Sequence, residues 1–263
     1  LPRDWMKSLL PEKEISCLRR DHFNTIILIT ASQMTRAPKT DPIEANSDPN
    51  ARKSTARSRS EISRGDIIRA AERISAERGI DSVSMVEIGQ ESGQKNRSAV
   101  QYHFGDKKGV LQGIREKHQL VITAHRNKML DELEASSEAT LHDVVEAFVV
   151  PLAQRLTEAD GGVAYVRIGA NLIGHSEYST ISSDEITRQR MARLFGHFLR
   201  KAQPLPSALI PGRILLVTTM LFHSLANWSR LPEQADGVSQ ERLDEFSRDL
   251  VNCVVSVVDT PSV

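Results

Sequence analysis

The sequence has few of the features that mark secreted or membrane proteins. Its 263 residues include two cysteines, Cys17 and Cys253, which excludes a disulfide framework and fits a reducing compartment. No run of about 18 consecutive apolar residues occurs, so we expect no membrane span. The early apolar run, residues 25–29, lacks the cleavage site of a secretory signal. The sequence therefore predicts a cytoplasmic protein.

Signatures of common enzyme classes are also missing. The chain has no His-Glu-x-x-His, no Cys-x-x-Cys, no glycine-rich phosphate loop and no Gly-x-Ser-x-Gly elbow. We expect no enzyme activity, no catalytic residue, no cofactor and no metal ligand. The alternative is a metal-dependent helical enzyme or metal sensor that uses His118 and His125, which are seven residues apart on one helix face, with His142, Asp143 and Glu146 nearby.

Charge is balanced overall but segregated along the chain. Residues 51–128 hold 16 Lys and Arg against 9 Asp and Glu, a net charge of +7, whereas residues 129–263 hold 11 against 18, a net charge of −7. A basic module joined to an acidic one is expected when only the first lies against a polyanion. Two unrelated solvated surfaces would give the same numbers.

The first 60 residues carry little that would fold. Residues 32–60 contain almost no large apolar side chain, so nothing offsets the entropic cost of ordering them. We expect residues 1–60 to be a disordered basic extension. Met34 begins a stretch typical of a polar N-terminus, and residues 1–33 are therefore expected to be an extension outside the working protein.

Helical signals begin near Glu61. Ile67, Ile68 and Ile74 recur at helical spacing before Gly79. Ser84 and Glu87 then form a capping box that opens a short helix, which ends at Gly93. A third short helix is expected over residues 97–103, and a fourth, capped by Asp106, over residues 107–135.

The rest of the chain is predicted to be all helix, with breakers between the helices and no strand alternation. Ser183 and Ser239 are the expected N-caps. We predict an all-α protein: a three-helix, homeodomain-like helix-turn-helix domain over residues 61–110 and a helical ligand-binding and dimerisation domain over residues 111–259. The expected helices cover residues 139–157, 162–175, 184–202, 209–229 and 239–258.

A short helix joined to a third helix by a tight turn after glycine is typical of a helix-turn-helix. In that arrangement the third helix fits the DNA major groove. Arg97, Ser98 and Gln101 have the length and hydrogen-bonding groups to read bases, whereas Ala99 and Val100 supply the packing side. The segment therefore predicts DNA binding. A structural DNA-compacting protein would share the basic block but would not need the acidic helical domain.

The same segment resembles the tetracycline-repressor (TetR) family. The stretch Tyr-His-Phe-Gly-Asp-Lys-Lys-Gly-Val-Leu, residues 102–111, is similar to the family's signature, and the resemblance covers about 50 residues. The turn between Gly93 and Ser98 is one residue longer than in most members. The resemblance implies a repressor that binds a pseudo-palindromic, double-stranded DNA operator as a homodimer and is released by a small-molecule effector.

By this resemblance Arg97, Ser98 and Gln101 are the base-reading candidates. Phe104 is expected to be a core residue, and His103 is expected either to contact DNA or to fix the third helix through backbone hydrogen bonds. The basic residues 52–59 are expected either to reach a minor groove as a flexible arm or to form a solvated tail. The candidate phosphate contacts are Ser84, Lys95, Asn96, Tyr102, His103 and Lys107.

The two last helices are the expected dimer surface. The helix at 239–258 has an apolar seam, and the helix at 209–229 is apolar almost all round, so both of its faces should be buried. The resemblance implies a four-helix bundle made by these helices. The predicted interface residues are Leu221, Leu225, Trp228, Leu243, Phe246, Leu250, Val254 and Val257.

The effector is expected to be largely apolar and to bind between the middle helices, where aromatic, Met and His residues face inward. Taken one at a time, each of these residues is more often plain core than a ligand contact. Tyr165, Asn171 and His223 are the most informative, because a buried polar group needs a partner. The predicted ligand residues are His118, Val121, His125, Phe148, Tyr165, Ile168, Asn171, Leu172, Met191, Phe195, Phe198, Met220 and His223.

Overall fold

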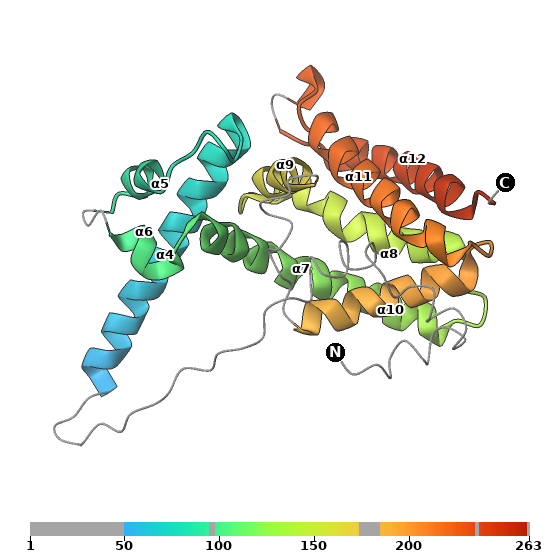
Figure 1. Ribbon diagram of the computed structural model, residues 1–263, viewed down its shortest axis with the longest axis horizontal. Helices are drawn as coiled ribbons and strands as arrows, with labels where there is room; N and C mark the ends of the chain where they lie inside the picture. The colour runs from blue at the N-terminus through green and yellow to red at the C-terminus, as the bar shows by residue number, and fades with distance from the viewer. Residues whose placement is uncertain (1–49, 95–97, 174–184, 235–236, 262–263) are drawn as a thin grey trace.

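The computed structural model describes residues 50–94, 98–173, 185–234 and 237–261 (Figure 1). Within these ranges every regular element is a helix. The all-α fold predicted from the hydrophobic periodicity is confirmed. The expected extension, residues 1–33, lies outside the described residues.

Three helices form the N-terminal unit: α4 (Asn50–Arg78), α5 (Met85–Glu91) and α6 (Ala99–Phe104). The helix α4 begins at Asn50 rather than near Glu61, so the expectation of disorder does not hold for residues 50–60. Once a helix is nucleated by buried residues, good helix formers such as Ala, Arg and Lys extend it at little cost. The core of the unit contains Ile67, Ile68, Ala71, Ile74, Ile80, Val83, Ile88 and Val100.

The long helix α7 (Lys107–Ala135) connects this unit to the rest of the chain (Figure 1). The Asp106 side chain accepts a hydrogen bond from the Gly109 amide at 2.8 Å and caps the helix. Near its start α7 packs against α6 and α4, and farther along it packs against α8 and α10. The same helix therefore touches both halves of the molecule.

The second half is a bundle centred on α8 (Leu141–Ala153), which packs against α7, α10 and α12. A 3-10 turn, Gln154–Thr157, leads to α9 (Gly162–Leu172), which packs against α11 and reaches back to α4. Ser239 precedes α12 but makes no side-chain cap, and Ser183 lies outside the described residues. The remaining helices are α10 (Glu185–Lys201), α11 (Ile210–Trp228) and α12 (Gln240–Asp259).

The helix α11 is apolar on both faces, but only one face is covered. Leu221 and Leu225 are buried, whereas Leu215 and Leu216 are 49% and 59% exposed. Together with its preceding turn, Ser207–Trp228 is long and apolar enough to cross a membrane by length and composition alone, a test that core helices of soluble proteins also pass. The structure thus leaves an apolar strip of α11 uncovered.

Candidate nucleic-acid interface

The helix α6 presents one face to the protein and the other to solvent. Ala99 and Val100 are buried against α5 and α7, whereas Gln101 is exposed and Tyr102 is 83% exposed. Side chains that point outward from a short, well-packed helix are free to enter a groove. Ser98, at the start of α6, is also exposed.

Ser84 forms the capping box that the sequence predicts. Its hydroxyl accepts a hydrogen bond from the Glu87 amide at 3.2 Å, and the Glu87 carboxylate accepts one from the Ser84 amide at 2.8 Å. A hydrogen bond from Arg78 at 2.7 Å, together with those from Ser84, lowers the pKa of Glu87 to about 2. A phosphate at Ser84 would therefore compete with an existing carboxylate.

The turn between α6 and α7 fixes the orientation of α6. A Cβ atom at Gly109 would lie 1.9 Å from the Phe104 carbonyl oxygen, so only glycine fits there. The half-buried Phe104 ring packs against the core, with the Arg64 guanidinium 5.0 Å from its centroid. The core position predicted for Phe104 is thus the one the structure gives.

The remaining DNA-binding candidates lie around α6. His103 is half-buried, with its ring edge-on to Tyr102 at a centroid distance of 5.2 Å, and the half-buried Lys107 begins α7. Lys95, Asn96 and Arg97 lie outside the described residues. The basic residues 52–59 belong to α4, although their side chains are outside the description.

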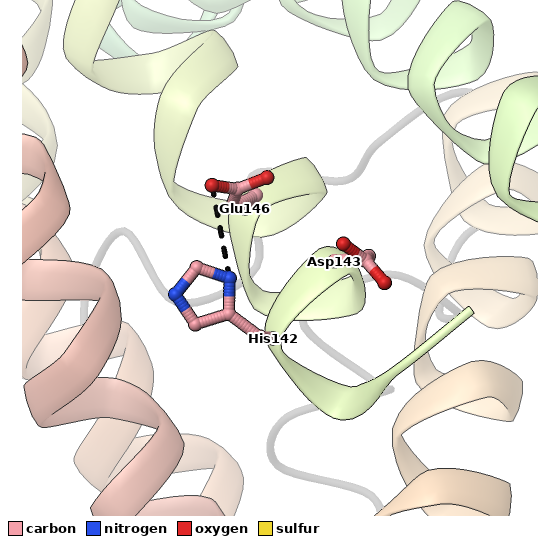
Figure 2. A group of neighbouring side chains, drawn as sticks. All are labelled: His142, Asp143 and Glu146. Carbon is pink, nitrogen blue, oxygen red and sulfur yellow. Dashed lines mark ion pairs between the residues drawn. The ribbon is translucent and has the colours of Figure 1, made fainter. Parts of the chain in front are cut away.

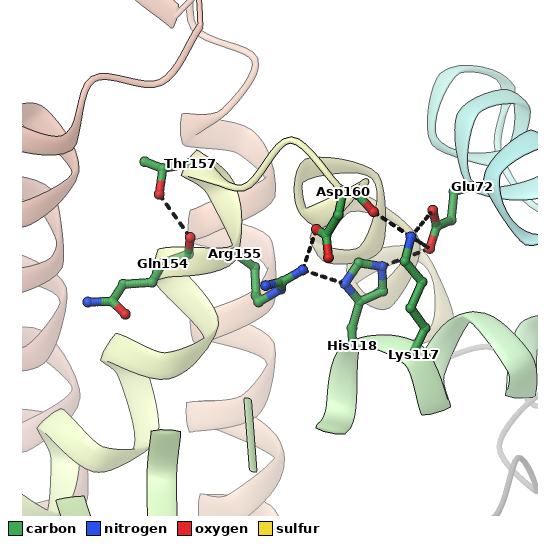
Figure 3. A network of polar contacts seen from close by, with 7 residues as sticks. All are labelled: Glu72, Lys117, His118, Gln154, Arg155, Thr157 and Asp160. Atoms are coloured by element: carbon green, nitrogen blue, oxygen red, sulfur yellow. Dashed lines mark hydrogen bonds and ion pairs between the residues drawn. The ribbon is translucent and has the colours of Figure 1, made fainter. Parts of the chain in front are cut away.

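A cluster of polar side chains joins α4 to the second half of the molecule (Figure 3). Glu72, only 2% exposed, accepts hydrogen bonds from Lys117 at 2.7 Å and bonds His118 Nε2 at 2.7 Å. His118 Nδ1 lies 3.0 Å from an Arg155 nitrogen, and Arg155 also pairs with Asp160. These five residues, called here the Glu72 cluster, come from α4, α7 and the segment before α9. A displacement of α7 or of the start of α9 would therefore move residues that are linked to Glu72 on α4.

The predicted ligand residues fall into three groups. His118 and Tyr165 are buried and stacked at 4.5 Å, next to the Glu72 cluster, and the Tyr165 hydroxyl accepts from Gln119 at 2.8 Å. Phe148 and Phe198 meet edge-on in the core. Ile168 is buried and Val121 is exposed, and the others are half-buried: His125, Asn171, Leu172, Met191, Phe195, Met220 and His223.

A surface groove lies elsewhere, between α8 and α12. It has a volume of about 200 Å³ and contains none of the predicted ligand residues. Its walls are Glu146, Val150, Gln154, Leu243, Asp244, Ser247, Arg248 and Val251. Three charged side chains line it, so it differs in character from the apolar pocket expected from the sequence.

The metal alternative loses its first ligand in the structure. Both ring nitrogens of His118 already have partners, Glu72 and Arg155. The other residues named for that alternative, His142, Asp143 and Glu146, lie together on the first turns of α8 (Figure 2). Asp143 caps that helix through Thr140, and His142 faces Glu146 at 3.7 Å. Helix capping and an ion pair account for this group.

The dimer prediction needs a correction at the level of residues. Leu221, Leu225, Leu243, Leu250 and Val254 are each at most 4% exposed because they pack within the chain's own core, where a partner could not reach them. Trp228 and Phe246, both half-buried, stack on each other at 4.9 Å, and Val257 is half-buried. The seam on α12 faces α8 and α11 instead.

Three buried charged residues were not singled out from the sequence. Glu72 and Arg155 belong to the Glu72 cluster, and Arg126 lies in the core between α7 and α8. Arg126 interrupts an apolar stripe at i, i+4 spacing, with buried Ile122 and Leu130 on either side. A charge inside such a stripe is the signal that would have revealed it.

Comparison with known proteins finds a family model that matches the segment around α6. Residues 67–114 match the family model described as bacterial regulatory proteins, tetR family. The match covers α5, α6 and the adjoining parts of α4 and α7, the segment in which α6 exposes Gln101 and Tyr102. A comparison with curated proteins found no match to the chain.

Proposed function

From the match of residues 67–114 to the tetR family of bacterial regulatory proteins, which indicates a DNA-binding transcriptional regulator, we propose that this chain is a dimeric repressor released by a small molecule. A regulator that binds DNA works where the DNA is, so we place it in the cytoplasm. The observation that carries the proposal is the outward face of α6, with Gln101 and Tyr102 exposed beside the buried Ala99 and Val100.

The exposed residues of α6 suit the two kinds of contact that DNA offers. The Gln101 amide can pair with an adenine edge in the major groove. The Tyr102 hydroxyl can bond a phosphate oxygen, which positions the helix without reading sequence. Ser98 at the start of α6 is the second base-reading candidate. His103 on α6 and Lys107 at the start of α7 are the candidates for contacts to the DNA backbone.

Dimerisation is proposed through the exposed strip of α11. Leu209, in the turn just before α11, and Leu215 and Leu216 on α11 are all at least 47% exposed, whereas the other side of the helix is core. Exposed apolar strips of this kind mark contact surfaces. A two-fold axis next to α11 would present two copies of α6 to an operator with half-sites roughly 34–36 Å apart.

Release would follow from a shift between two arrangements of α7. An effector that binds one arrangement better lowers operator affinity by the difference between its two affinities. The Glu72 cluster ties α7 and the start of α9 to α4, so the arrangement favoured by the effector is transmitted to the DNA-binding unit. The effector is proposed to bind among the middle helices.

Selection from a random DNA pool tests the function directly. The full chain should enrich one pseudo-palindromic sequence, and footprinting should show two protected half-sites about one helical turn apart. The Gln101→Ala variant should fail to enrich the same sequence. Enrichment of no sequence, or binding with no preferred site, would contradict the proposal and favour a non-specific DNA-binding role.

A further inference from the structure

Arg126 is a buried cation in the core of the second half of the molecule. Its side chain, 6% exposed, comes from α7 and reaches α8 and α10. Nε donates to the Ala147 carbonyl at 3.1 Å, one Nη donates to the Phe148 carbonyl at 3.4 Å, and the other lies 3.3 Å from Met191 Sδ. All three acceptors are neutral. Within the described part of the chain no carboxylate pairs with Arg126.

Part of this arrangement has a local explanation. Pro151 lies inside α8 and has no N–H, so the carbonyl four residues earlier, that of Ala147, loses its helical partner. Arg126 Nε supplies the missing donor. A neutral donor would serve that carbonyl equally well, so the proline explains one of the five N–H groups of the guanidinium. It does not explain why the side chain is charged.

The charge itself is costly where it lies. Transfer of an ion out of water is unfavourable unless an opposite charge compensates it. Burial lowers the pKa of Arg126 to about 10, which still leaves the guanidinium protonated at neutral pH. A buried cation whose only acceptors are two carbonyls and a thioether has unused capacity for an anion.

The surroundings of Arg126 define what kind of anion fits. Met191 is half-buried, and its thioether is the weakest of the three acceptors and sits on a flexible side chain. Phe148, Phe195 and Phe198 form a connected aromatic group next to it. One cation among apolar walls is the usual composition of a site for an amphipathic organic acid.

We propose that Arg126 binds the carboxylate of the effector, an organic acid with an apolar body. The carboxylate takes the place of Met191 Sδ at the guanidinium, and the apolar body lies along Phe148 and Phe195. This inference rests on the proposed function, since it names the class of small molecule that acts on the helical domain. A phosphorylated compound is disfavoured because its second charge would need a further cation.

The site has a direct route to the DNA-binding unit. Arg126 and His118 lie eight residues apart on α7, close to the same helix face. His118 belongs to the Glu72 cluster and bonds Glu72 of α4. An anion that displaces Arg126 would therefore displace α7, the helix that contributes His118 to the Glu72 cluster.

Thermal unfolding of the full chain with matched probes tests the inference. The probes are octanoate against octanamide, phenylacetate against phenylacetamide, and inorganic phosphate. At least one carboxylate should raise the Tm of the wild-type protein in a concentration-dependent way, and its amide should not. The Arg126→Gln variant, which keeps a donor for Ala147, should bind the acid at least about tenfold more weakly.

A matched control is Arg167→Gln. Arg167 is also partly buried, and it donates to the hydroxyl and carbonyl of Ser229, so its loss disturbs packing without touching the proposed site. This variant should keep the carboxylate response. Circular dichroism checks that both variants are folded. The comparison of acid with amide needs no variant at all.

Three results would overturn the inference: no carboxylate stabilises the wild-type protein more than its amide does, Arg126→Gln keeps the full response, or phosphate alone reproduces it. Operator binding is measured in parallel to separate this inference from the proposed function. A carboxylate that binds through Arg126 without releasing DNA would contradict the release mechanism and leave the site standing. Release of DNA by the amides would contradict the Arg126 site and leave the release mechanism standing.

Discussion

Gln101 and Tyr102 are neighbours on α6, but they suit different parts of DNA. The glutamine amide has the two-sided hydrogen-bonding pattern of an adenine edge, whereas the tyrosine offers one hydroxyl on a broad ring. Both side chains are exposed and leave the packing of α6 to Ala99 and Val100. Their removal should therefore change recognition without changing the fold.

The Gln101→Ala variant should lose about 1–3 kcal/mol of binding at the operator and keep its non-specific affinity. The reason is that a base contact contributes only when the matching base is present. Fluorescence anisotropy with operator and scrambled duplexes measures both affinities. The control is Gln203→Ala, an exposed glutamine distant from α6. Equal weakening on both duplexes would show that Gln101 reads no base.

A substitution at Gly161 tests the connection that the Glu72 cluster makes between α4 and the start of α9. Its φ is +95°, and a Cβ atom there would lie 2.4 Å from a Glu72 carboxylate oxygen. Gly79 has a similar φ, +82°, with nothing within 4 Å of the added atom. Gly79→Ala should therefore cost about 1–3 kcal/mol of backbone strain alone. Gly161→Ala should cost more, since the buried carboxylate must also move.

Urea unfolding followed by circular dichroism gives the two free energies of unfolding. The Gly161→Ala variant should in addition respond more weakly to the effector in the operator-release assay, because the joint between α4 and α9 is displaced. If the two alanine variants are equally stable, the Glu72 carboxylate moves away from the added Cβ atom at no cost in free energy.

At the scale of helices, an ion-pair network holds α10 against α7. Arg193 donates to Glu134 at 2.7 Å and to Asp131 at 2.8 Å, and His197 lies 2.8 Å from Glu134. The hydrogen bond from Arg193, against a smaller opposing effect of burial, lowers the pKa of Glu134 from 4.5 to about 2. A lowered carboxyl pKa means that the folded state favours the ionised form.

The network makes the free energy of unfolding depend on pH. Because the folded pKa of Glu134 is below the unfolded one, its contribution is complete above pH 4.5 and is lost as the pH falls towards 2. Glu134→Gln should therefore destabilise the protein at pH 7, and the difference from wild type should shrink at pH 3. Urea titrations at the two pH values measure it. Glu132→Gln, at an exposed position with a partner 3.9 Å away, is the control.

The extent of most helices follows from local chemistry that the sequence displays. The Ser84 capping box, the Asp106 cap and the breakers between helices are short-range signals, and α7 matches its expected range. The start of α4 could not be predicted in the same way. Helix extension over residues 50–60 depends on a nucleus farther along the chain rather than on apolar periodicity of its own.

Which partner each apolar face meets is a long-range property, and there the sequence was less informative. Leu243, Leu250 and Val254 form the seam expected on α12, but it is α8 and α11 of the same chain that cover it. Periodicity shows that a face is buried and does not show by what. The partners of Glu72 and Arg126 also lie on other helices, so the sequence could not show what these buried charges contact.

At the scale of the whole molecule, the exposed strip of α11 should decide the oligomeric state. Leu216 is 59% exposed, and Leu216→Glu would place two like charges near the proposed two-fold axis. The variant should be a monomer at micromolar concentration, which analytical ultracentrifugation measures. Operator affinity should fall steeply, because the second DNA-binding unit is no longer held next to its half-site by the first.

Leu120→Glu provides the matched comparison, since Leu120 is 72% exposed on α7, away from α11. It should leave the sedimentation of the protein and its operator affinity unchanged. A wild-type protein that sediments as a monomer, or a Leu216→Glu variant that remains dimeric, would rule out α11 as the pairing surface.

Because α7 is long, a small tilt of the helix would displace its far end by a large distance. From Lys107 to Arg126 the helix rises roughly 28 Å. Over that distance a tilt of about 5° displaces the far end by about 2.5 Å. In a symmetric pair the two displacements add, and a duplex of fixed pitch cannot follow them. In the proposed dimer, a small tilt of α7 within the bundle would therefore be enough to move the two copies of α6 out of register with their half-sites.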